Sequence, residues 1–155
     1  MPKHYYSLLL LLLFACREKN LFSKEYSLKD GSWYSKDTLV FKWNAPDTTT
    51  RYNLVLGIGH EDNIPSQNIY VKTISSDPAG KSKEQLVSLE LIAPSGKPFG
   101  NCSDGPCDLR IILGSGVFFP QQGTYSLALV PWSRVDPLTG INKITLTIEP
   151  SNQMK

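Results

Sequence analysis

The sequence is poor in the residues from which most active sites are built. Its 155 residues include two histidines and three cysteines, and His60 is the only histidine outside the N-terminal segment. It contains no glycine-rich phosphate loop and no His-Glu-x-x-His pattern. The formal net charge of +2 is too small to generate the long-range field of a nucleic-acid-binding protein. These shortages argue against nucleotide chemistry and a nucleic-acid partner, and nothing in the sequence predicts a cofactor or a small-molecule ligand.

Long hydrophobic runs are also missing, apart from a short one near the start. Residues 5–14 are apolar except for Ser7, with consecutive leucines from Leu8 to Leu13. This length is about half of the roughly twenty residues that a helix needs to cross a bilayer. A positively charged start followed by such a run is typical of a cleavable signal peptide.

The end of this run resembles the lipobox of bacterial lipoprotein signal peptides. Leu13 and Ala15 occupy the recognition positions before Cys16, although Phe14 is bulkier than the usual middle residue. The resemblance implies cleavage before Cys16 and attachment of lipid to its thiol, which together with further acylation holds a protein firmly on a membrane. Because Arg17 rather than Asp follows, the resemblance favours the outer membrane over the inner one.

Removal of Cys16 from the count leaves Cys102 and Cys107. In an oxidising compartment these two are expected to form a disulfide, and the Asp-Gly-Pro turn between them can bring the thiols together. A zinc site is the weaker alternative, because no second pair of ligands completes it.

The rest of the chain predicts one all-β domain. We divide the sequence into a signal peptide (1–15), a polar tether (16–30), a β-sandwich domain (31–150) and a short tail (151–155). The domain is rich in turn formers, since the chain has 11 Gly and 11 Pro. Within it, apolar residues alternate with polar ones in short runs, the signature of strands with one buried face.

Seven such runs predict an antiparallel sandwich of about seven strands, immunoglobulin-like or jelly-roll-like. In addition, the segment Pro120–Tyr125 resembles the tyrosine corner of immunoglobulin-like domains, in which a Tyr hydroxyl bonds to upstream backbone. The alternating runs are centred on Leu39-Phe41-Trp43, Leu54-Leu56-Ile58, Ile69-Val71, Val87-Leu89-Leu91, Leu109-Ile111-Leu113, Tyr125-Leu127-Leu129 and Ile144-Leu146-Ile148.

Three sets of residues are candidates for chemistry or binding. The cluster His60-Glu61-Asp62 has the groups of an acid/base pair or metal site, although a polar loop after a strand is the favoured interpretation. Oxygen ligands for Ca²⁺ occur at Asn101, Asp104 and Asp108, where a solvated disulfide loop is favoured instead. Aromatic rings that would stack on sugars, if exposed, are those of Trp33, Tyr34, Tyr70 and Trp132.

Residues 33–149 resemble the gliding-motility lipoprotein family of the Bacteroidetes, component H (GldH). The resemblance is carried, in this order, by Trp33-Tyr34-Ser35-Lys36-Asp37, Ala45-Pro46-Asp47, Tyr52-Asn53-Leu54, Ala93-Pro94-Ser95-Gly96, Gly100, Phe119-Pro120, Gly123-Thr124-Tyr125 and Gly140-Ile141. It implies a membrane-anchored, non-enzymatic accessory protein of gliding motility, a process that works alongside the type IX secretion machinery. Our first hypothesis is that the lipid-anchored domain docks other envelope components of that machinery. The alternatives are a surface carbohydrate-binding or adhesin-like module and, third, an enzyme centred on His60.

Overall fold

The computed structural model describes residues 20–103 and 105–151. Strands dominate these residues, and no helix among them is long and apolar enough to span a bilayer. The elements in chain order are β1 (Phe22–Ser27), the 3-10 helix η1 (Lys29–Gly31), β2 (Ser32–Trp33), β3 (Leu39–Ala45), β4 (Tyr52–His60), β5 (Asn68–Ser76), β6 (Ser82–Glu90), β7 (Cys107–Val117), β8 (Gly123–Pro131), β9 (Leu138–Thr139) and β10 (Ile141–Pro150).

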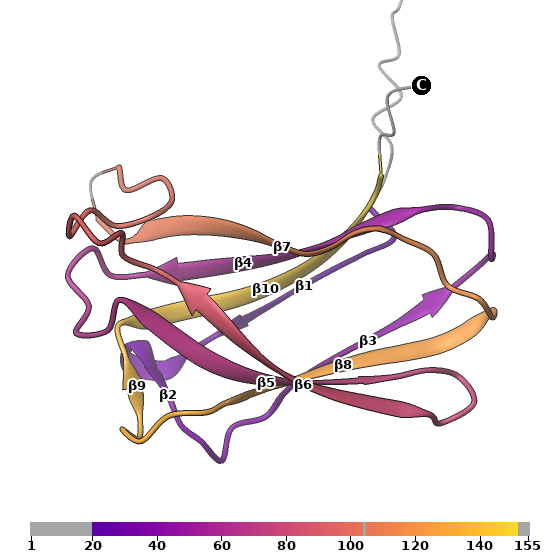
Figure 1. Cartoon of the computed structure of the whole chain (residues 1–155), viewed down its shortest axis with the longest axis horizontal. Coiled ribbons are helices and arrows are strands. Elements are labelled where there is room, and N and C mark those ends of the chain that lie inside the picture. Colours follow the sequence, from indigo (N-terminus) through magenta and orange to yellow (C-terminus); the bar gives the residue numbers. More distant parts are fainter. Residues whose placement is uncertain (1–19, 104, 152–155) are drawn as a thin grey trace, which may run out of the picture.

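Two four-stranded antiparallel sheets form a sandwich (Figure 1). The first sheet has the order β1-β10-β4-β7 and the second has the order β3-β8-β5-β6, while β2 and β9 form a small two-stranded ribbon at one end. The predicted all-β sandwich is confirmed, and the seven predicted runs correspond to β3, β4, β5, β6, β7, β8 and β10.

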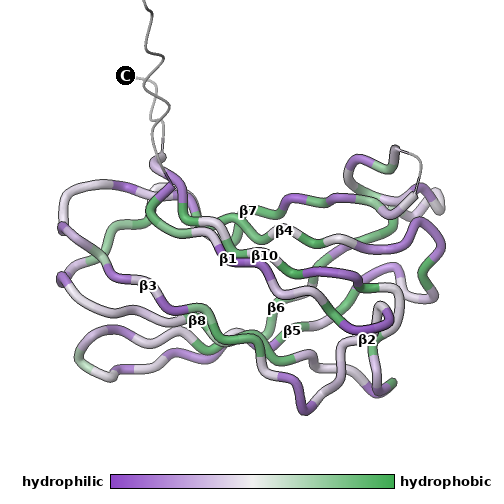
Figure 2. Tube along the Cα trace, turned by 180° about the vertical axis from the view of Figure 1, so that it is seen from behind, coloured by the Kyte–Doolittle hydropathy of each residue, from purple (hydrophilic) through white to green (hydrophobic). Residues whose placement is uncertain are grey.

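The core consists of the inward-facing side chains of both sheets. Along β10, Ile144, Leu146 and Ile148 are completely buried and alternate with Lys143, Thr145 and Thr147 on the outer face. The other strands alternate in the same way and direct their apolar side chains into the core. Figure 2 shows the apolar residues as bands along the strands. Burial of one face of each sheet is therefore the main stabilising interaction of the domain.

The predicted tether of residues 16–30 is wrong over its second half. Residues 22–27 form β1, which pairs with β10 from Phe22–Ile148 to Ser27–Lys143, and η1 follows it. The Leu21 N–H also donates to the Ile148 carbonyl at 2.8 Å. The folded domain thus begins only a few residues after Cys16, so any link to a lipid at that position is short.

Side chains of β1 close one side of the sandwich against β3. The Tyr26 hydroxyl donates to the Val40 carbonyl at 2.6 Å, and its ring packs edge-on against Phe41 at 5.2 Å between centroids. Near the start of β1, the Phe22 ring lies 6.0 Å from that of Trp43. Strand β1 therefore joins the two sheets as well as extending one of them.

The tyrosine corner is present as predicted. The Tyr125 hydroxyl donates to the Gln121 carbonyl at 3.0 Å and accepts the Gln121 N–H at 3.2 Å. The ring itself belongs to an aromatic cluster, with Phe119 at 4.8 Å and Trp43 at 6.2 Å. The corner thereby fixes the loop between β7 and β8 to the end of the core.

Close approach of another side chain explains one of the two glycines in β4. The aliphatic part of Lys143 lies across Gly59, where an added Cβ would come within 2.5 Å of Lys143 Cγ.

A disulfide joins Cys102 to Cys107, as predicted. Cys107 is the first residue of β7 and is completely buried, and it pairs with His60 at the end of β4. Backbone bonds between Asn101 and Asp108 continue the ladder beyond the disulfide. The bridge therefore holds the long connection between β6 and β7 against the first sheet.

The tyrosine corner makes a measurable contribution to stability. We expect Tyr125→Phe to lower the free energy of unfolding by about 1–3 kcal/mol, because the Gln121 N–H and carbonyl lose their partner in a partly buried position. Urea denaturation measures this change. Tyr70→Phe is the matched control, because its hydroxyl is on an exposed side chain, and its effect should stay within about 0.5 kcal/mol. Equal effects of the two substitutions would contradict a role for the corner.

The disulfide closes a very short loop, so its effect on stability is limited. We expect Cys102→Ser to lower the free energy of unfolding by about 2 kcal/mol, the loop entropy of the cross-link. Urea denaturation under non-reducing conditions gives the value, and wild-type protein unfolded with a reductant should lose a similar amount. Failure of the variant to fold would show that the bridge does more than restrict the unfolded chain.

Candidate functional site

The predicted lipid-anchor residues Leu13, Ala15 and Cys16 lie outside the described residues. What the structure places is the start of the folded domain. Strand β1 begins at the end of the sandwich where β10 finishes and where β4 starts with Tyr52. We call this the anchor-proximal end, and the end that carries β2 and β9 lies opposite it (Figure 1).

His60 is a buried structural residue. Its side chain is completely buried, with Nδ1 2.7 Å from the Glu61 carbonyl oxygen and Nε2 3.1 Å from the Phe99 carbonyl oxygen. Both ring nitrogens therefore face backbone, and neither is turned toward a substrate or metal. The cluster His60-Glu61-Asp62 is not assembled as a site, because the Glu61 carboxylate instead accepts from the Asn142 amide at 2.8 Å.

The oxygen-rich residues near the disulfide are not assembled as a site either. Asp104 is outside the described residues, and the Asp108 carboxylate binds the Lys143 ammonium at 2.9 Å. This hydrogen bond raises the pKa of Lys143 above its usual range. Residues 20–103 and 105–151 contain no cluster of three or more His, Cys, Asp or Glu side chains suited to a metal ion.

The four aromatic candidates separate into two groups. Trp33 is completely buried, and its indole N–H donates to the Asp37 carbonyl at 2.9 Å, so it is a core residue. Tyr34 is exposed beside Lys36. Tyr70 and Trp132 are 46% and 55% exposed and lie on the same outer face of the second sheet.

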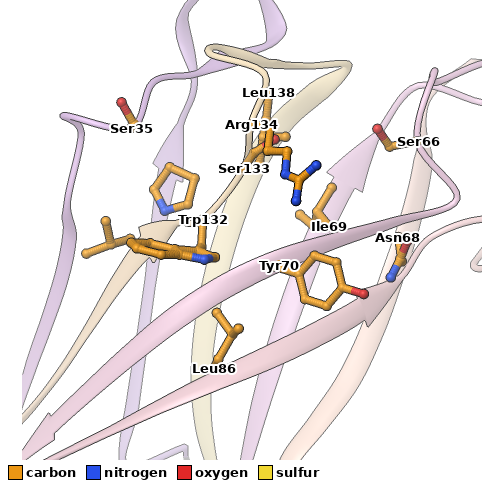
Figure 3. Close-up of a pocket in the computed structure, with 12 residues that line it drawn as sticks. Ser35, Ser66, Asn68, Ile69, Tyr70, Leu86, Trp132, Ser133, Arg134 and Leu138 are labelled. Atoms are coloured by element: carbon orange, nitrogen blue, oxygen red, sulfur yellow. The ribbon is translucent and has the colours of Figure 1, made fainter.

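Tyr70 and Trp132 line a hollow that we call the outer groove (Figure 3). Its volume is about 850 Å³, and Leu86 of β6, which is 55% exposed, adds to its apolar surface. Polar groups line it as well, from Asn68 of β5 and from Arg134 of the loop after β8. Exposed aromatic rings with an amide and a guanidinium group make this the most ligand-like part of the outer surface.

Two contacts hold Trp132 in place, one through its backbone and one through its ring. Its backbone N–H donates to the Tyr70 carbonyl at 2.8 Å, which extends the β5–β8 ladder beyond β8. The Lys72 ammonium lies 4.5 Å from the ring centroid and pairs with Glu84 at 3.0 Å. A cation packed against the ring restrains the orientation of the indole.

The loop that follows Trp132 is fixed to the segment after β2. The Asp136 carboxylate accepts the Ser35 N–H at 2.8 Å and the Ser35 hydroxyl at 2.7 Å. The bond from the Ser35 N–H is the larger cause that lowers the pKa of Asp136 below its usual range. Because Ser35 also lines the outer groove, this contact fixes the wall of the groove and not only the loop.

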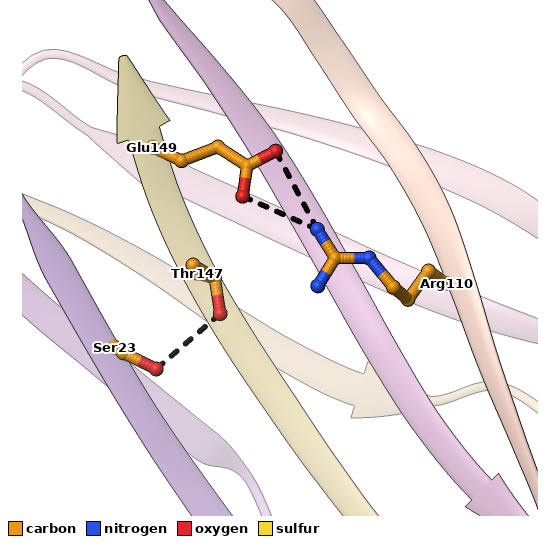
Figure 4. A network of polar contacts seen from close by, with 4 residues as sticks. All are labelled: Ser23, Arg110, Thr147 and Glu149. Carbon is orange, nitrogen blue, oxygen red and sulfur yellow. Dashed lines mark hydrogen bonds and ion pairs between the residues drawn. The ribbon is translucent and has the colours of Figure 1, made fainter. Parts of the chain in front are cut away.

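The outer face of the first sheet has the opposite character. Arg110 of β7 pairs with Glu149 of β10 at 3.2 Å, and the hydroxyls of Ser23 and Thr147 lie 3.3 Å apart (Figure 4). Apart from the exposed Ile112, these paired polar groups give a surface suited to solvent. The aromatic outer face of the second sheet is therefore a specific feature of that sheet.

Sequence analysis identified Tyr70 and Trp132 but missed Leu86 and Arg134. Leu86 is on the exposed side of β6, opposite the inward-facing Val87 and Leu89. Arg134 is in a loop without periodicity, so no sequence pattern connects it to Tyr70. Only the pairing of β5 with both β6 and β8 brings these residues together.

Comparisons with known proteins agree with the family resemblance. A family model described as GldH lipoprotein matches residues 20–148. The gliding motility lipoprotein GldH of Flavobacterium johnsoniae is 28% identical over 146 residues, which cover 90% of each chain. A gliding motility lipoprotein GldH homolog of Christiangramia forsetii is 22% identical over 151 residues, which cover 92% of this chain and 91% of that one.

Among solved structures, the chain is similar to one titled "Structure of infectious bursal disease virus Gx strain", with 13% identity and a TM-score of 0.32. It covers 88% of this chain and 31% of the viral chain, and a likeness this slight carries no conclusion. The family match carries more weight than this likeness, because it extends over nearly all of the sandwich. The chain belongs to the GldH lipoprotein family.

Proposed function

We propose that this protein is a lipid-anchored, non-enzymatic accessory protein of gliding motility that docks other cell-envelope components of the motility or type IX secretion machinery. Family membership and the names of both relatives support the process. The lipobox-like Leu13-Phe14-Ala15-Cys16 supports the anchor, and Arg17 supports the outer membrane. The buried state of His60 removes the best candidate for catalysis among the described residues.

The outer groove is the observation that carries the docking proposal. Trp, Tyr and Arg are the residues that most often dominate the binding energy of protein interfaces, and the groove brings together Trp132, Tyr70 and Arg134. It lies toward the β2–β9 end, away from the anchor-proximal end. A protein held by lipid at Cys16 would present this groove away from the membrane, where a partner in the envelope can reach it.

The partner that best matches the groove is a protein segment with both apolar and acidic side chains. Apolar groups would cover Leu86 and the rings of Tyr70 and Trp132, while a carboxylate would pair with Arg134. The described residues form only three ion pairs, and Arg134 belongs to none of them. A partner carboxylate would therefore not have to displace an internal one.

A carbohydrate is the second candidate ligand, and the same groove favours it. The indole of Trp132 is flat, half exposed and supported on one side by Lys72, which suits stacking on the apolar face of a sugar. Asn68, Ser66 and Arg134 offer hydrogen bonds to hydroxyl groups. Trp33 takes no part in such a platform, because it is buried.

The lipid anchor is tested by Cys16→Ser. We expect the variant to fold normally but to leave the membrane fraction, with loss of gliding in a strain that depends on this protein. Fractionation, labelling with a palmitate analogue and a spreading assay measure the three effects. Normal function of the unacylated, soluble form would overturn the proposed role of the anchor.

The docking surface is tested by Trp132→Ala in the acylated protein. We expect crosslinked pull-down from native membranes to recover motility or secretion components with the wild type, and affinity to fall by about tenfold or more with the variant, as for a hot-spot residue. Ile112→Ala, which truncates a 63% exposed side chain of the first sheet, is the matched control and should bind normally.

The same pair of proteins separates the two candidate ligands. Glycan-array binding by the wild type that is lost in Trp132→Ala, with no protein recovered by pull-down, would replace protein docking by carbohydrate binding. Equal recovery of partners by Trp132→Ala and the wild type would place docking elsewhere on the domain.

A further inference from the structure

A second hollow lies between the two sheets, on the side opposite β1 and β3. It is open between the edge strands β6 and β7 and has a volume of about 670 Å³. Side chains of strands β3 to β8, of the β5–β6 turn and of the β7–β8 loop line it, and we call it the inter-sheet cleft. Two free sheet edges thus flank an entrance to the interior of the sandwich.

The two walls of the cleft differ in chemistry. The wall formed by the first sheet is apolar, with Ile111, Leu113 and Leu54 only partly buried. The facing wall changes character along β5 and β6, where Val71 and Val87 are followed on the same face by the pairs Thr73–Gln85 and Ser75–Lys83. In a sandwich, the inward-facing side chains of both sheets are normally apolar. The inward polar residues of β5 and β6 therefore make this cleft suited to an amphiphile or to solvent.

The indole of Trp43 supplies a second and independent observation. Trp43 lines the cleft and is 7% exposed, and its Nε1 is a buried donor with no acceptor among the described residues. Buried donors are nearly always paired, so a small shift of the rings that enclose this N–H would open it to the cleft and let it reach an oxygen acceptor there. The rings of Phe22, Phe119 and Tyr125 pack around this indole at centroid distances of 5.9–6.2 Å. The Tyr125 hydroxyl is already bonded to the Gln121 backbone.

The position of the cleft relates it to the membrane. Its lining includes Val117, the last residue of β7, and Phe118, which follows it at the anchor-proximal end and is 51% exposed. Five Cα–Cα steps separate Cys16 from Leu21, and they span at most about 18 Å. A lipid at Cys16 would therefore keep this end of the domain close to the bilayer surface. On this point the inference rests on the proposed lipid anchor.

We propose that the inter-sheet cleft binds an acyl lipid, with the hydrocarbon chain along the apolar wall and the Trp43 N–H donating to the carbonyl or carboxylate oxygen. The hydrocarbon covers Ile111, Leu113 and Val87, which are otherwise partly exposed to water. The polar end reaches the other wall, where Lys81 and Lys83 line the cleft beside one carboxylate, Asp77, and leave a net positive charge that favours an anionic group. A free fatty acid and a membrane phospholipid share this chemistry.

Photoreactive acyl probes test the proposal on the acylated full-length protein. In one arm the protein is inserted in vesicles that contain a phosphatidylglycerol with a diazirine in its acyl chain. In the other arm a diazirine-bearing palmitic acid is added to vesicles without photoreactive phospholipid. We expect labelling within Ile111–Phe119, which trypsin releases in the single peptide Ile111–Arg134. Labelling from the first arm alone assigns a membrane phospholipid, and labelling from the second alone assigns a free fatty acid.

Two substitutions and a control make the result specific. Gln85→Trp places a bulky side chain in the cleft from its polar wall and should reduce labelling by about fivefold or more, because the ring takes the volume of the chain. Glu84→Trp, one residue away on the outer face of β6, should label like the wild type. Trp43→Phe removes the donor but keeps an aromatic ring, and should reduce labelling at limiting probe by about two- to tenfold, as loss of one hydrogen bond predicts.

The outcomes that overturn the proposal are distinct from failure of the anchor. Absence of label from Ile111–Phe119, or equal labelling of Gln85→Trp and the wild type, would exclude the cleft as a lipid site. Unchanged labelling of Trp43→Phe would exclude the assigned role of the indole N–H. The palmitic acid arm does not depend on the anchor and can be repeated with the Cys16→Ser protein. If the wild-type protein proves not to be acylated, the proposed anchor is refuted, and this arm still tests the cleft.

Discussion

Aromatic rings packed at the anchor-proximal end hold the two sheets together at the point where the chain enters the domain. Phe22 of β1, Trp43 of β3, Phe119 of the β7–β8 loop and Tyr125 of β8 form a continuous set of contacts with centroid distances of 4.8–6.2 Å. Tyr52 joins it through Phe119. This set fixes the first strand, the tyrosine corner and the start of β4 in one place, so the chain enters the domain at a defined point.

The sandwich that results is closed on one side and open on the other. On the closed side, β1 supplies Tyr26 and Phe22 to β3. On the open side, the inward residues of β5 and β6 become polar toward the anchor-proximal end, and a hollow remains between β6 and β7. Such a departure from binary patterning costs hydrophobic burial, and proteins retain departures of this kind mainly at functional sites.

Most of the fold could be predicted because apolar and polar residues alternate along seven of the strands. Strand β1 could not, since Lys24 shares a face with Phe22 and Tyr26 and breaks the apolar run. Its ammonium group donates to the Tyr26 hydroxyl at 2.6 Å and lies over the ring, which is how an inward-pointing charge is accommodated on an edge strand. The pair β2–β9, of two residues each, is too short to carry any periodic signal.

The candidate sites were less predictable than the fold. Cys102 and Cys107 could be paired from redox logic alone, and the tyrosine corner from a short motif. The outer groove depends on β5 lying between β6 and β8, and the inter-sheet cleft on which edges are left free; both are properties of strand order, which one sequence does not specify. Trp33 and Trp132 look alike in the sequence, as tryptophans at strand ends, yet one is buried completely and the other is half exposed.

With a lipid at Cys16, as proposed, the two hollows would lie at different distances from the membrane, because the link from Cys16 to the folded domain is short. A flexible tether of fifteen residues, as first expected for 16–30, would have allowed either end of the domain to face the bilayer. A link of five Cα–Cα steps does not, because it is shorter than β10, whose ten residues span about 33 Å. The proposed anchor would thereby keep the cleft within reach of lipid and the outer groove beyond the headgroups, where proteins and glycans are found. A single constraint near the N-terminus would thus direct the two surfaces to different classes of ligand.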